Sequence, residues 1–349
     1  MKETTKKKKI SITDIANSLN VSKTLVSMVI NNHGNTQGIS KATQKRVWEK
    51  IKEMNYKPNL IARSLRLGKS NTLGLIVSDI SNSFYSKIAR NIERYAESKG
   101  FNLIISSTDE EISREVRLIN MLKDRQVDGL IISSSQIDSS EFDLLNKDNY
   151  PFVLIDRYIP SLKSNYVGVD NKKGAYDALM HLIKQGYDKI AVFAITPTYV
   201  SSINDRIIGY MKALMDSGLN YNKNLLKEIP FNNIKQSVKE ELKKLLLPKN
   251  KINAIFAINN NVAIACIEYL NEMHIKIPED VALICFDDID LFKLTIPTIT
   301  SVEQPIEEIC KQAVDILISE IDNNINTSPN EKQHIEMPTN LLIRRSTVK

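Results

Sequence analysis

The chain has few cysteines, and their placement excludes a disulfide framework. Among its 349 residues only Cys266, Cys285 and Cys310 are cysteines, and their spacing is not that of metal ligands. An odd set confined to the last third of a chain cannot form the paired framework of a secreted protein. We therefore expect a protein of the reducing cytoplasm.

Long apolar runs are also absent. No uninterrupted apolar stretch approaches the roughly 20 residues that a membrane-spanning helix needs. The lysine-rich start is not followed by the apolar segment of a secretory signal. The sequence thus predicts neither a membrane anchor nor export, which argues against a secreted solute-binding receptor.

Catalytic motifs are missing as well. The four histidines, His33, His181, His274 and His334, are scattered, and no H-E-x-x-H, G-x-S-x-G or phosphate-binding loop pattern occurs. We expect no enzyme activity, no catalytic residue, no metal site and no cofactor.

Basic charge is concentrated at one end. Residues 1–70 hold 15 Lys or Arg against 4 Asp or Glu, a net charge of +11, whereas the other 279 residues hold 32 against 37, a net of −5. This asymmetry indicates a module that docks on phosphates, joined to a larger body that does not. The run over residues 6–9 is weaker evidence, since four lysines at a terminus are usually a solvated tail.

Residues 12–30, I-T-D-I-A-N-S-L-N-V-S-K-T-L-V-S-M-V-I, predict two short helices that meet at a tight turn. Thr13 and Ser22 stand where N-caps are expected, and apolar residues follow each at helical spacing. The second helix leaves four residues outward: Lys23, Thr24, Ser27 and Met28. Such a helix suits the major groove of DNA, although similar pairs occur in plain helical bundles.

A third helix is predicted from Ser40 to about Asn55. Its apolar positions, Val47, Trp48, Ile51 and Met54, are spaced to pack on the first two helices. We therefore expect a three-helix headpiece with its single Trp in the core rather than at a base-stacking surface.

From Ser70 onward apolar strands alternate with amphipathic helices, the pattern of a doubly wound parallel sheet. The first set of strands is L-G-L-I-V, F-N-L-I-I-S, D-G-L-I-I-S-S and P-F-V-L-I-D, with helices over about 83–99, 111–125 and 140–147. The second set is Y-V-G-V-D, K-I-A-V-F-A, L-L-K-E-I-P, A-I-F-A-I and A-L-I-C-F-D, with helices around 172–185, 204–217, 233–246 and 261–274. The predicted fold class is α/β, with two lobes facing each other across a cleft for a small ligand.

Seven motifs together are specific to one family: T-D-I-A-x-x-L-x-V-S-x-x-x-V-S, Y-K-P-N-x-x-A-R-S-L-R, G-L-I-V-S-D-I-S-N-S-F-Y, V-D-G-L-I-I, D-R-I-I-G-Y, F-D-D-I and T-S-V-E-Q-P. Over residues 10–346 the chain resembles the LacI/GalR (lactose/galactose repressor) family of transcriptional regulators. The resemblance implies a homodimer, in the first place a repressor, that binds a palindromic operator under the control of a small molecule. It also implies a hinge helix and a core like that of periplasmic binding proteins.

The expected divisions follow from the charge and periodicity patterns together with the resemblance. They are a basic tail over 1–9, a helix-turn-helix headpiece over 10–57, a hinge linker over 58–69 and a sensor core over 70–349. Within the core we expect lobe 1 at about 70–164 and 299–323, and lobe 2 at about 165–298 and 324–349.

Family motifs assign the DNA contacts by resemblance. Lys23, Thr24 and Met28 match specificity positions, where Lys23 suits guanine acceptors and Met28 allows only apolar contacts, for example with a thymine methyl. Ser22, Ser27 and Asn31 match phosphate or register contacts, with a merely solvated hydroxyl as the alternative for Ser27. Leu65 matches a leucine that paired hinge helices insert into the minor groove, flanked by Arg63 and Arg66.

The resemblance also assigns the effector site. Arg206 and Asp287 match positions that hold effectors in relatives, and Asn259 matches an asparagine at a strand end. Three first-lobe residues are expected to face the same space: Asp79, Phe84 and Asp156. Loop hydrogen bonds are the alternative for Asp79 and Asp156, and Asp288 is expected to be structural.

Departures from the family pattern leave the effector open. Asn260 stands where the family commonly has Asp, and the segment A-I-T-P-T-Y-V-S-S is unusual at the cleft rim. We expect a sugar or sugar derivative, and keep a purine-like ligand or a protein co-regulator as alternatives.

Overall fold

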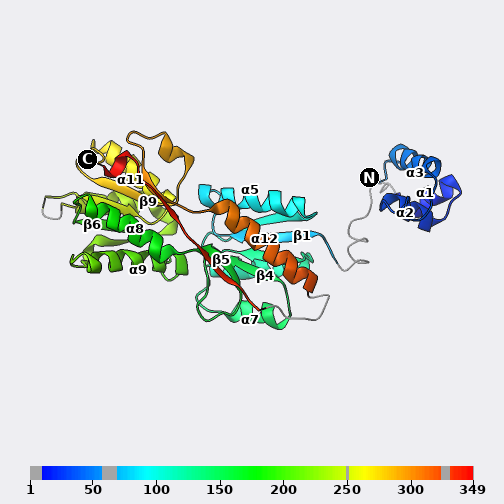
Figure 1. Cartoon of the computed structure of the whole chain (residues 1–349), viewed down its shortest axis with the longest axis horizontal. Coiled ribbons are helices and arrows are strands. Elements are labelled where there is room, and N and C mark those ends of the chain that lie inside the picture. Colours follow the sequence, from blue (N-terminus) through cyan, green and yellow to red (C-terminus); the bar gives the residue numbers. More distant parts are fainter. Residues whose placement is uncertain (1–9, 57–68, 249–250, 324–330, 349) are drawn as a thin grey trace, which may run out of the picture. The chain divides into compact units, whose positions relative to one another are not determined.

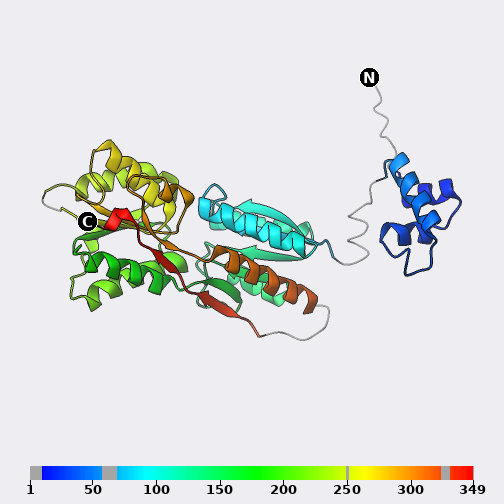
Figure 2. The ribbon, with the colours of Figure 1, turned by 45° about the horizontal axis from the view of Figure 1, so that its top comes forward.

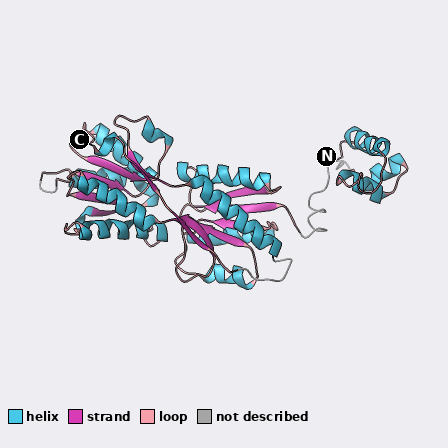
Figure 3. Cartoon of the chain, in the orientation of Figure 1, coloured by secondary structure: helices cyan, strands magenta, loops and turns pink. Residues whose placement is uncertain are grey.

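The computed structural model describes residues 10–56, 69–248, 251–323 and 331–348. The chain divides into two compact units, Met1–Ser70 and Asn71–Lys349. Figures 1 and 3 show the helices and strands of each unit.

The first unit is a three-helix headpiece. Its helices are α1 (Ile12–Leu19), α2 (Lys23–Ile30) and α3 (Lys41–Glu53). They enclose a small core of buried side chains: Ile15, Ala16, Val26, Val29, Val47 and Tyr56. The three helices expected from the sequence are therefore present.

The N-cap of α1 is Ser11, so the expected cap at Thr13 is wrong. The Ser11 hydroxyl accepts a hydrogen bond from the Asp14 amide at 3.2 Å, and the Asp14 carboxylate accepts one from the Ser11 amide at 2.7 Å. This reciprocal capping box needs an acid three residues after the cap, a condition that Ser11 meets. Ser22 and Ser40 cap α2 and α3 as expected.

The expected core position of Trp48 is also wrong, because 45% of this residue is exposed. Val47 takes the inward position of α3 and is fully buried. Successive helical residues are turned by about 100°, so the side chain after Val47 points away from α1 and α2.

The first lobe of the second unit is a six-stranded parallel sheet in the order β11-β5-β4-β3-β1-β2. The strands are β1 (Thr72–Val77), β2 (Asn102–Ser107), β3 (Gly129–Ile132), β4 (Phe152–Ile155), β5 (Asn165–Val169) and β11 (His334–Met337). Its helices are α5 (Ser83–Ser98), α6 (Ile112–Asp124), α7 (Ser140–Lys147) and α12 (Ile306–Asn323). The first and last helices of the unit, α5 and α12, lie side by side (Figures 1 and 2).

The second lobe repeats this plan in the order β12-β10-β9-β8-β6-β7, parallel except for β12. The strands are β6 (Ile190–Ile195), β7 (Leu226–Ile229), β8 (Ala254–Ala257), β9 (Ala282–Phe286), β10 (Thr300–Glu303) and β12 (Asn340–Leu342). Its helices are α8 (Asn171–Lys184), α9 (Ser201–Asp216), α10 (Ile234–Leu245) and α11 (Asn260–Glu272). The predicted α/β class with two lobes is confirmed.

The expected lobe limits need correction at three strands. β5 was expected to open lobe 2, but it pairs with β4 in the first sheet. β10 was expected in lobe 1 and pairs with β9 in the second sheet, while β11 was expected in lobe 2 and pairs with β5 in the first. The chain therefore passes between the lobes three times, after β5, after β10 and after β11.

A close helix packing holds α8 and α9 together in the second lobe. A Cβ atom added at Gly209 would stand 2.3 Å from the carbonyl oxygen of Lys172 and 2.9 Å from the Ala175 Cβ. Real Cβ atoms do not approach a backbone oxygen so closely, so only glycine allows this contact. Gly209 thus lets α9 pack closely against α8.

Among the described residues there is no disulfide bond, since the three cysteines are buried and unpaired: Cys266, Cys285 and Cys310. None of the helices described is both long and apolar enough to cross a membrane. Within the same ranges no group of three His, Cys, Asp or Glu side chains is placed to hold a metal ion.

Candidate functional site

The headpiece presents the N-terminal half of α2 to solvent. Lys23 and Thr24 are exposed in its first turn, and Ser27 and Met28 lie one turn later and are half-buried. Lys23 and Ser27 are four residues apart, as are Thr24 and Met28, so the four side chains form two adjacent rows along α2. A helix surface of this kind fits the major groove of DNA.

Two of the expected phosphate-contact residues also hold the ends of α2. The Ser22 hydroxyl accepts a hydrogen bond from the Leu25 amide at 3.1 Å. Asn31 is the C-cap, and its side-chain amide donates to the Ser27 carbonyl oxygen at 2.8 Å. Both side chains are thus fixed in place at the ends of the helix that carries Lys23 and Thr24.

Arg63, Leu65 and Arg66 of the expected hinge lie outside the described residues. Their role in DNA binding remains a prediction from the family resemblance.

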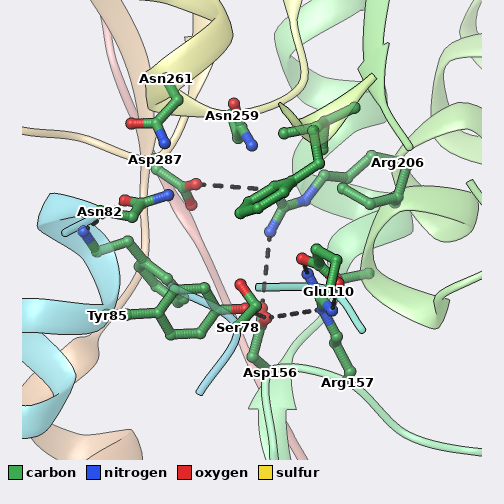
Figure 4. Close-up of a pocket in the computed structure, with 15 residues that line it drawn as sticks. Ser78, Asn82, Tyr85, Glu110, Asp156, Arg157, Arg206, Asn259, Asn261 and Asp287 are labelled. Carbon is green, nitrogen blue, oxygen red and sulfur yellow. Dashed lines mark hydrogen bonds and ion pairs between the residues drawn. The ribbon is translucent and has the colours of Figure 1, made fainter. Parts of the chain in front are cut away.

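A buried cavity lies between the two lobes of the second unit, where the carboxyl ends of several strands meet (Figure 4). From the first lobe it is lined by Ser78, Asn82, Phe84, Tyr85, Glu110, Asp156 and Arg157. From the second lobe it is lined by Ile195, Ser202, Ile203, Arg206, Phe231, Asn259, Asn261 and Asp287. The edge where parallel strands end is the usual ligand site of such sheets.

The lobes are closed onto each other around this cavity. Tyr158 of the first lobe donates from its amide to the Ser201 hydroxyl at 2.7 Å and from its own hydroxyl to Asp205 at 2.9 Å. The Asn260 amide donates to the Asn82 side-chain oxygen at 2.9 Å. The cavity has a volume of only about 30 Å³, room for about two waters. A larger ligand needs the lobes to part.

Glu110 and Arg157 form a buried ion pair in the first lobe. The guanidinium donates to the two carboxylate oxygens at 2.7 and 2.6 Å, and to the Ser135 hydroxyl at 2.9 Å. Burial alone would raise the pKa of Glu110, but the charge and hydrogen bonds of Arg157 hold that pKa below its ordinary value. The pair is therefore charged and mutually neutralised.

Arg206 projects from α9 and is 3% exposed. Its Nε donates to the Asn171 side-chain oxygen and its Nη1 to the carbonyl oxygen of Ile258, each at 2.8 Å. The guanidinium carbon also stacks 3.7 Å from the centre of the Phe286 ring. These contacts hold the guanidinium within the second lobe, facing the first.

Asp156 and Asp287 lie on opposite sides of that guanidinium. One Asp156 oxygen is 4.0 Å from Nη2 and one Asp287 oxygen is 3.8 Å from Nη1. Both distances exceed a hydrogen bond. Burial raises the pKa of Asp287, although the Arg206 charge and a 2.6 Å hydrogen bond from Gln304 oppose the shift.

Phenylalanines line the cavity from both lobes. Phe84 begins the first turn of α5, and its ring lies edge-on to Tyr85 with centroids 5.1 Å apart. Phe231 follows β7 in the second lobe. The cavity thus offers apolar ring faces as well as hydrogen-bonding groups.

The structure brings five of the six expected effector residues to this cavity: Phe84, Asp156, Arg206, Asn259 and Asp287. Asp79 does not line it, because its carboxylate accepts hydrogen bonds from the amide and hydroxyl of Ser81 in the loop before α5. Asp288 is structural as expected, since it accepts from Arg344 and Ser301 at 2.6 Å each.

Several lining residues were missed by the sequence reasoning, chiefly Ser78, Glu110, Arg157 and Asn82. Ser78 directly follows β1, and Arg157 stands two residues after β4. Their position just past apolar strands was a usable signal, because these strand ends converge. Phe231 carried no comparable signal.

Comparisons with known proteins agree with this architecture. Residues 11–59 match the model of bacterial regulatory proteins of the lacI family, and residues 179–347 match a periplasmic binding protein-like domain. The repressor PurR of Aliivibrio salmonicida is 30% identical over 97% of this chain and 99% of its own. The regulator DegA of Bacillus subtilis is 33% identical over 97% and 98%. A lac repressor dimer bound to operator shares the fold, with a TM-score of 0.84 at 21% identity over 98% of this chain and 100% of that one.

Proposed function

The chain belongs to the lacI family of bacterial regulatory proteins, and on that premise we propose how its two units divide the work of a repressor. It is a DNA-binding transcriptional regulator. In our proposal the headpieces of a homodimer read the two halves of a palindromic operator, and a small molecule in the interlobe cavity controls the affinity. Since its target is chromosomal DNA, we place its action in the cytoplasm.

The observation that carries the DNA-binding proposal is the surface of α2. Lys23 and Thr24 are exposed at the start of the helix, where base edges of the major groove are read. Lys23 would donate to guanine acceptors, and Met28 would contact a thymine methyl. Ser22, Ser27 and Asn31 would hold the helix in register against phosphates. In the linker, Leu65 would enter the minor groove between Arg63 and Arg66.

DNA selection followed by fluorescence anisotropy tests this proposal. The full-length protein should enrich a palindromic sequence, and its affinity should fall steeply with salt because phosphate contacts release counterions. Lys23→Ala should weaken binding to the selected operator and relax preference at one base position, by about 1–3 kcal/mol. Lys52→Ala, an exposed lysine of α3, is the matched control for lost charge. Equal losses for both variants would refute base reading by Lys23.

The cavity supports a hydroxyl-rich effector such as a sugar. Asp156, Asp287 and Arg206 supply acceptors and donors from both lobes. A second candidate, a flat nitrogen base, is favoured by Phe84 and Phe231, because one aromatic ring from each lobe can stack on a planar ligand. Asn259 and the other side-chain amides of the cavity would serve either class.

A thermal-shift screen against sugars, nucleosides and bases separates these candidates, since a ligand of the folded state raises its melting temperature. The hit should also change the salt-matched affinity for operator. Arg206→Ala should lose that response while the dimer remains folded, and Lys212→Ala, on the same helix but exposed, should keep it. A normal response from Arg206→Ala would remove this residue from the effector site.

A further inference from the structure

Two aspartates occupy the same place in the two lobes. Asp156 comes one residue after β4 and Asp287 one residue after β9. Both have left-handed backbone, with φ of 62° and 78°, and both are nearly buried, at 7% and 5% exposure. Aspartate tolerates this conformation better than most residues. The repeated fold thus sets one carboxylate on each wall of the cavity.

Each of these carboxylates uses one oxygen within the protein and turns the other toward the cavity. Asp156 Oδ2 accepts from the Tyr85 hydroxyl at 2.8 Å, and Asp287 Oδ1 accepts from Gln304 at 2.6 Å. The other oxygens, Asp156 Oδ1 and Asp287 Oδ2, approach only Arg206, at 4.0 and 3.8 Å (Figure 4). Two acceptors that face the cavity, one from each lobe, therefore accept no hydrogen bond from the described residues.

The guanidinium groups of the cavity are partly engaged. Arg157 is held by Glu110 through two hydrogen bonds, and its Nε, which has no hydrogen-bond partner in the described part of the chain, lies 3.5 Å from Asp156 Oδ2. Arg206 uses its Nε–H on Asn171 and one N–H of Nη1 on Ile258, so the second N–H of Nη1 and both of Nη2 have no hydrogen bond among the described residues. An anion that reached Nη2 would lie beside the Asp156 carboxylate. An anion on the Nη1 side would lie beside the Asp287 carboxylate, which is 3.8 Å from that nitrogen.

The net charge of the side chains that line the cavity also disfavours an anionic ligand. Glu110, Asp156 and Asp287 oppose Arg157 and Arg206, so three carboxylates face two guanidinium groups. All five side chains are at most 8% exposed. In so dry a site an uncompensated negative charge strongly disfavours a second one.

We infer that the effector is a neutral or amine-bearing molecule whose hydrogen-bond donors bridge Asp156 and Asp287, and that phosphate esters and carboxylates are excluded. This inference rests on the proposed role of the cavity as the effector site. It accommodates both proposed ligand classes, since sugar hydroxyls and the amino groups of bases are donors.

Matched probes of different charge test the inference on the full-length protein. The first set is glucose, glucosamine and glucose 6-phosphate, and the second is adenosine and AMP. In whichever set binds, calorimetry should show the phosphate ester weaker than its neutral parent by about tenfold or more, because like charges are brought together without water between them. A phosphate ester that binds more tightly than its parent and alters operator affinity would overturn the inference while leaving the effector site standing. If no probe of any charge binds, the effector proposal fails and this inference fails with it.

A second test needs no ligand. Asp287→Asn keeps the size, the acceptor for Gln304 and the tolerance of left-handed backbone, but removes one negative charge. At pH 7 it should raise the melting temperature, whereas Asp216→Asn, on the exposed part of α9, should leave it unchanged. A fall in melting temperature for Asp287→Asn would show that the negative charge of Asp287 is balanced by Arg206 in the folded protein. It would thereby overturn the argument that the cavity carries excess negative charge.

The pH dependence of that difference follows from the raised pKa of Asp287. A carboxyl group whose pKa in the folded state is raised above its ordinary value of 3.8 penalises the folded state at higher pH, and the penalty disappears as pH falls toward 3.8. The charged groups around it are Arg206, Asp156 and the Asp288–Arg344 pair. A neighbouring pocket that Asp287 also lines adds Lys87, Lys293, Glu303 and Glu307. The advantage of Asp287→Asn should therefore shrink on acidification, and a constant or growing advantage would contradict the assignment to Asp287.

Discussion

Single residues of the cavity depend on partners distant in the sequence. Glu110 and Arg157 are 47 positions apart and meet because the loops after β2 and β4 converge at one edge of the sheet. The family motifs single out Arg206 and Asp287, but no local pattern pairs Glu110 with Arg157. A buried pair of this kind is visible only once strand order is known.

Breaking this pair should be costly. Glu110→Gln leaves the buried Arg157 charge without its counter-ion, so urea denaturation of the second unit should show a loss of about 3–5 kcal/mol. The loss should be full above pH 4.5, the ordinary pKa of a glutamate side chain, and should diminish as pH falls below it, since the parent carboxyl is then protonated too.

The control for Glu110→Gln is an exposed pair. Lys212 and Asp216 are 2.9 Å apart on the surface of α9, and Asp216→Asn should leave the stability nearly unchanged, because solvent screens an exposed pair. Equal effects for the two variants would mean that the Glu110–Arg157 pair is not a buried, mutually dependent unit.

Three residue-level predictions failed for different physical reasons. Thr13 lost the cap to Ser11, whose acid stands three residues later. Trp48 has helical spacing for the core, but Val47 beside it fills the inward position. Asp79 turns back on its own loop at Ser81. In each case a residue close by in the sequence decided the outcome: Ser11 took the cap, Val47 took the core position, and Ser81 bound the carboxylate.

At the level of elements, the sequence predicts the helices and strands from α1 to β9 to within a few residues, because nearly continuous apolar runs and amphipathic helices are local signals. The later elements, β10, α12, β11 and β12, were not among those expected. The strand neighbours are not local. β5 follows β4 closely and pairs with it, and β11 reaches the first sheet from the far end of the chain. Periodicity carries no information about such partners, so the lobe limits were misplaced.

The cap of α1 offers an element-scale prediction. Ser11→Ala removes both hydrogen bonds of its side chain and should destabilise the headpiece by about 1 kcal/mol. Thr13→Ala, at an exposed position within the helix, should cost less. Thermal melting of the two variants, followed by the circular dichroism of the headpiece helices, distinguishes them. A larger loss of stability for Thr13→Ala would show that Thr13, and not Ser11, caps α1.

At the scale of the whole molecule, the hydrophobic cores determine which parts of the chain unfold as one cooperative unit. The headpiece has its own core around Val47. In the second unit one cluster contains side chains of both lobes, from Leu73 in β1 to Phe286 in β9. The two lobes are thus packed into a common core, and the headpiece is not part of it.

Calorimetry of the full chain should therefore show a small transition for the headpiece and one larger transition for both lobes. Val47→Ala should move only the small transition, by about 2 kcal/mol or less in stability, as a buried valine loses two methyl groups. Phe286→Leu should move only the large one. Separate transitions for the two lobes would contradict the shared core.

The three passages of the chain between the lobes also affect how the protein is made. The first sheet is complete only when β11 has joined β5, and α12 covers it beside α5. Both elements are synthesised after the whole of β6 to β10. A ribosome-bound chain must therefore hold the first lobe without α12 and β11 while the second emerges, although domains commonly fold as they leave the ribosome. Nascent chains that stop before residue 306 should remain sensitive to protease in the first lobe, so this regulator completes that lobe only after β11 has been synthesised.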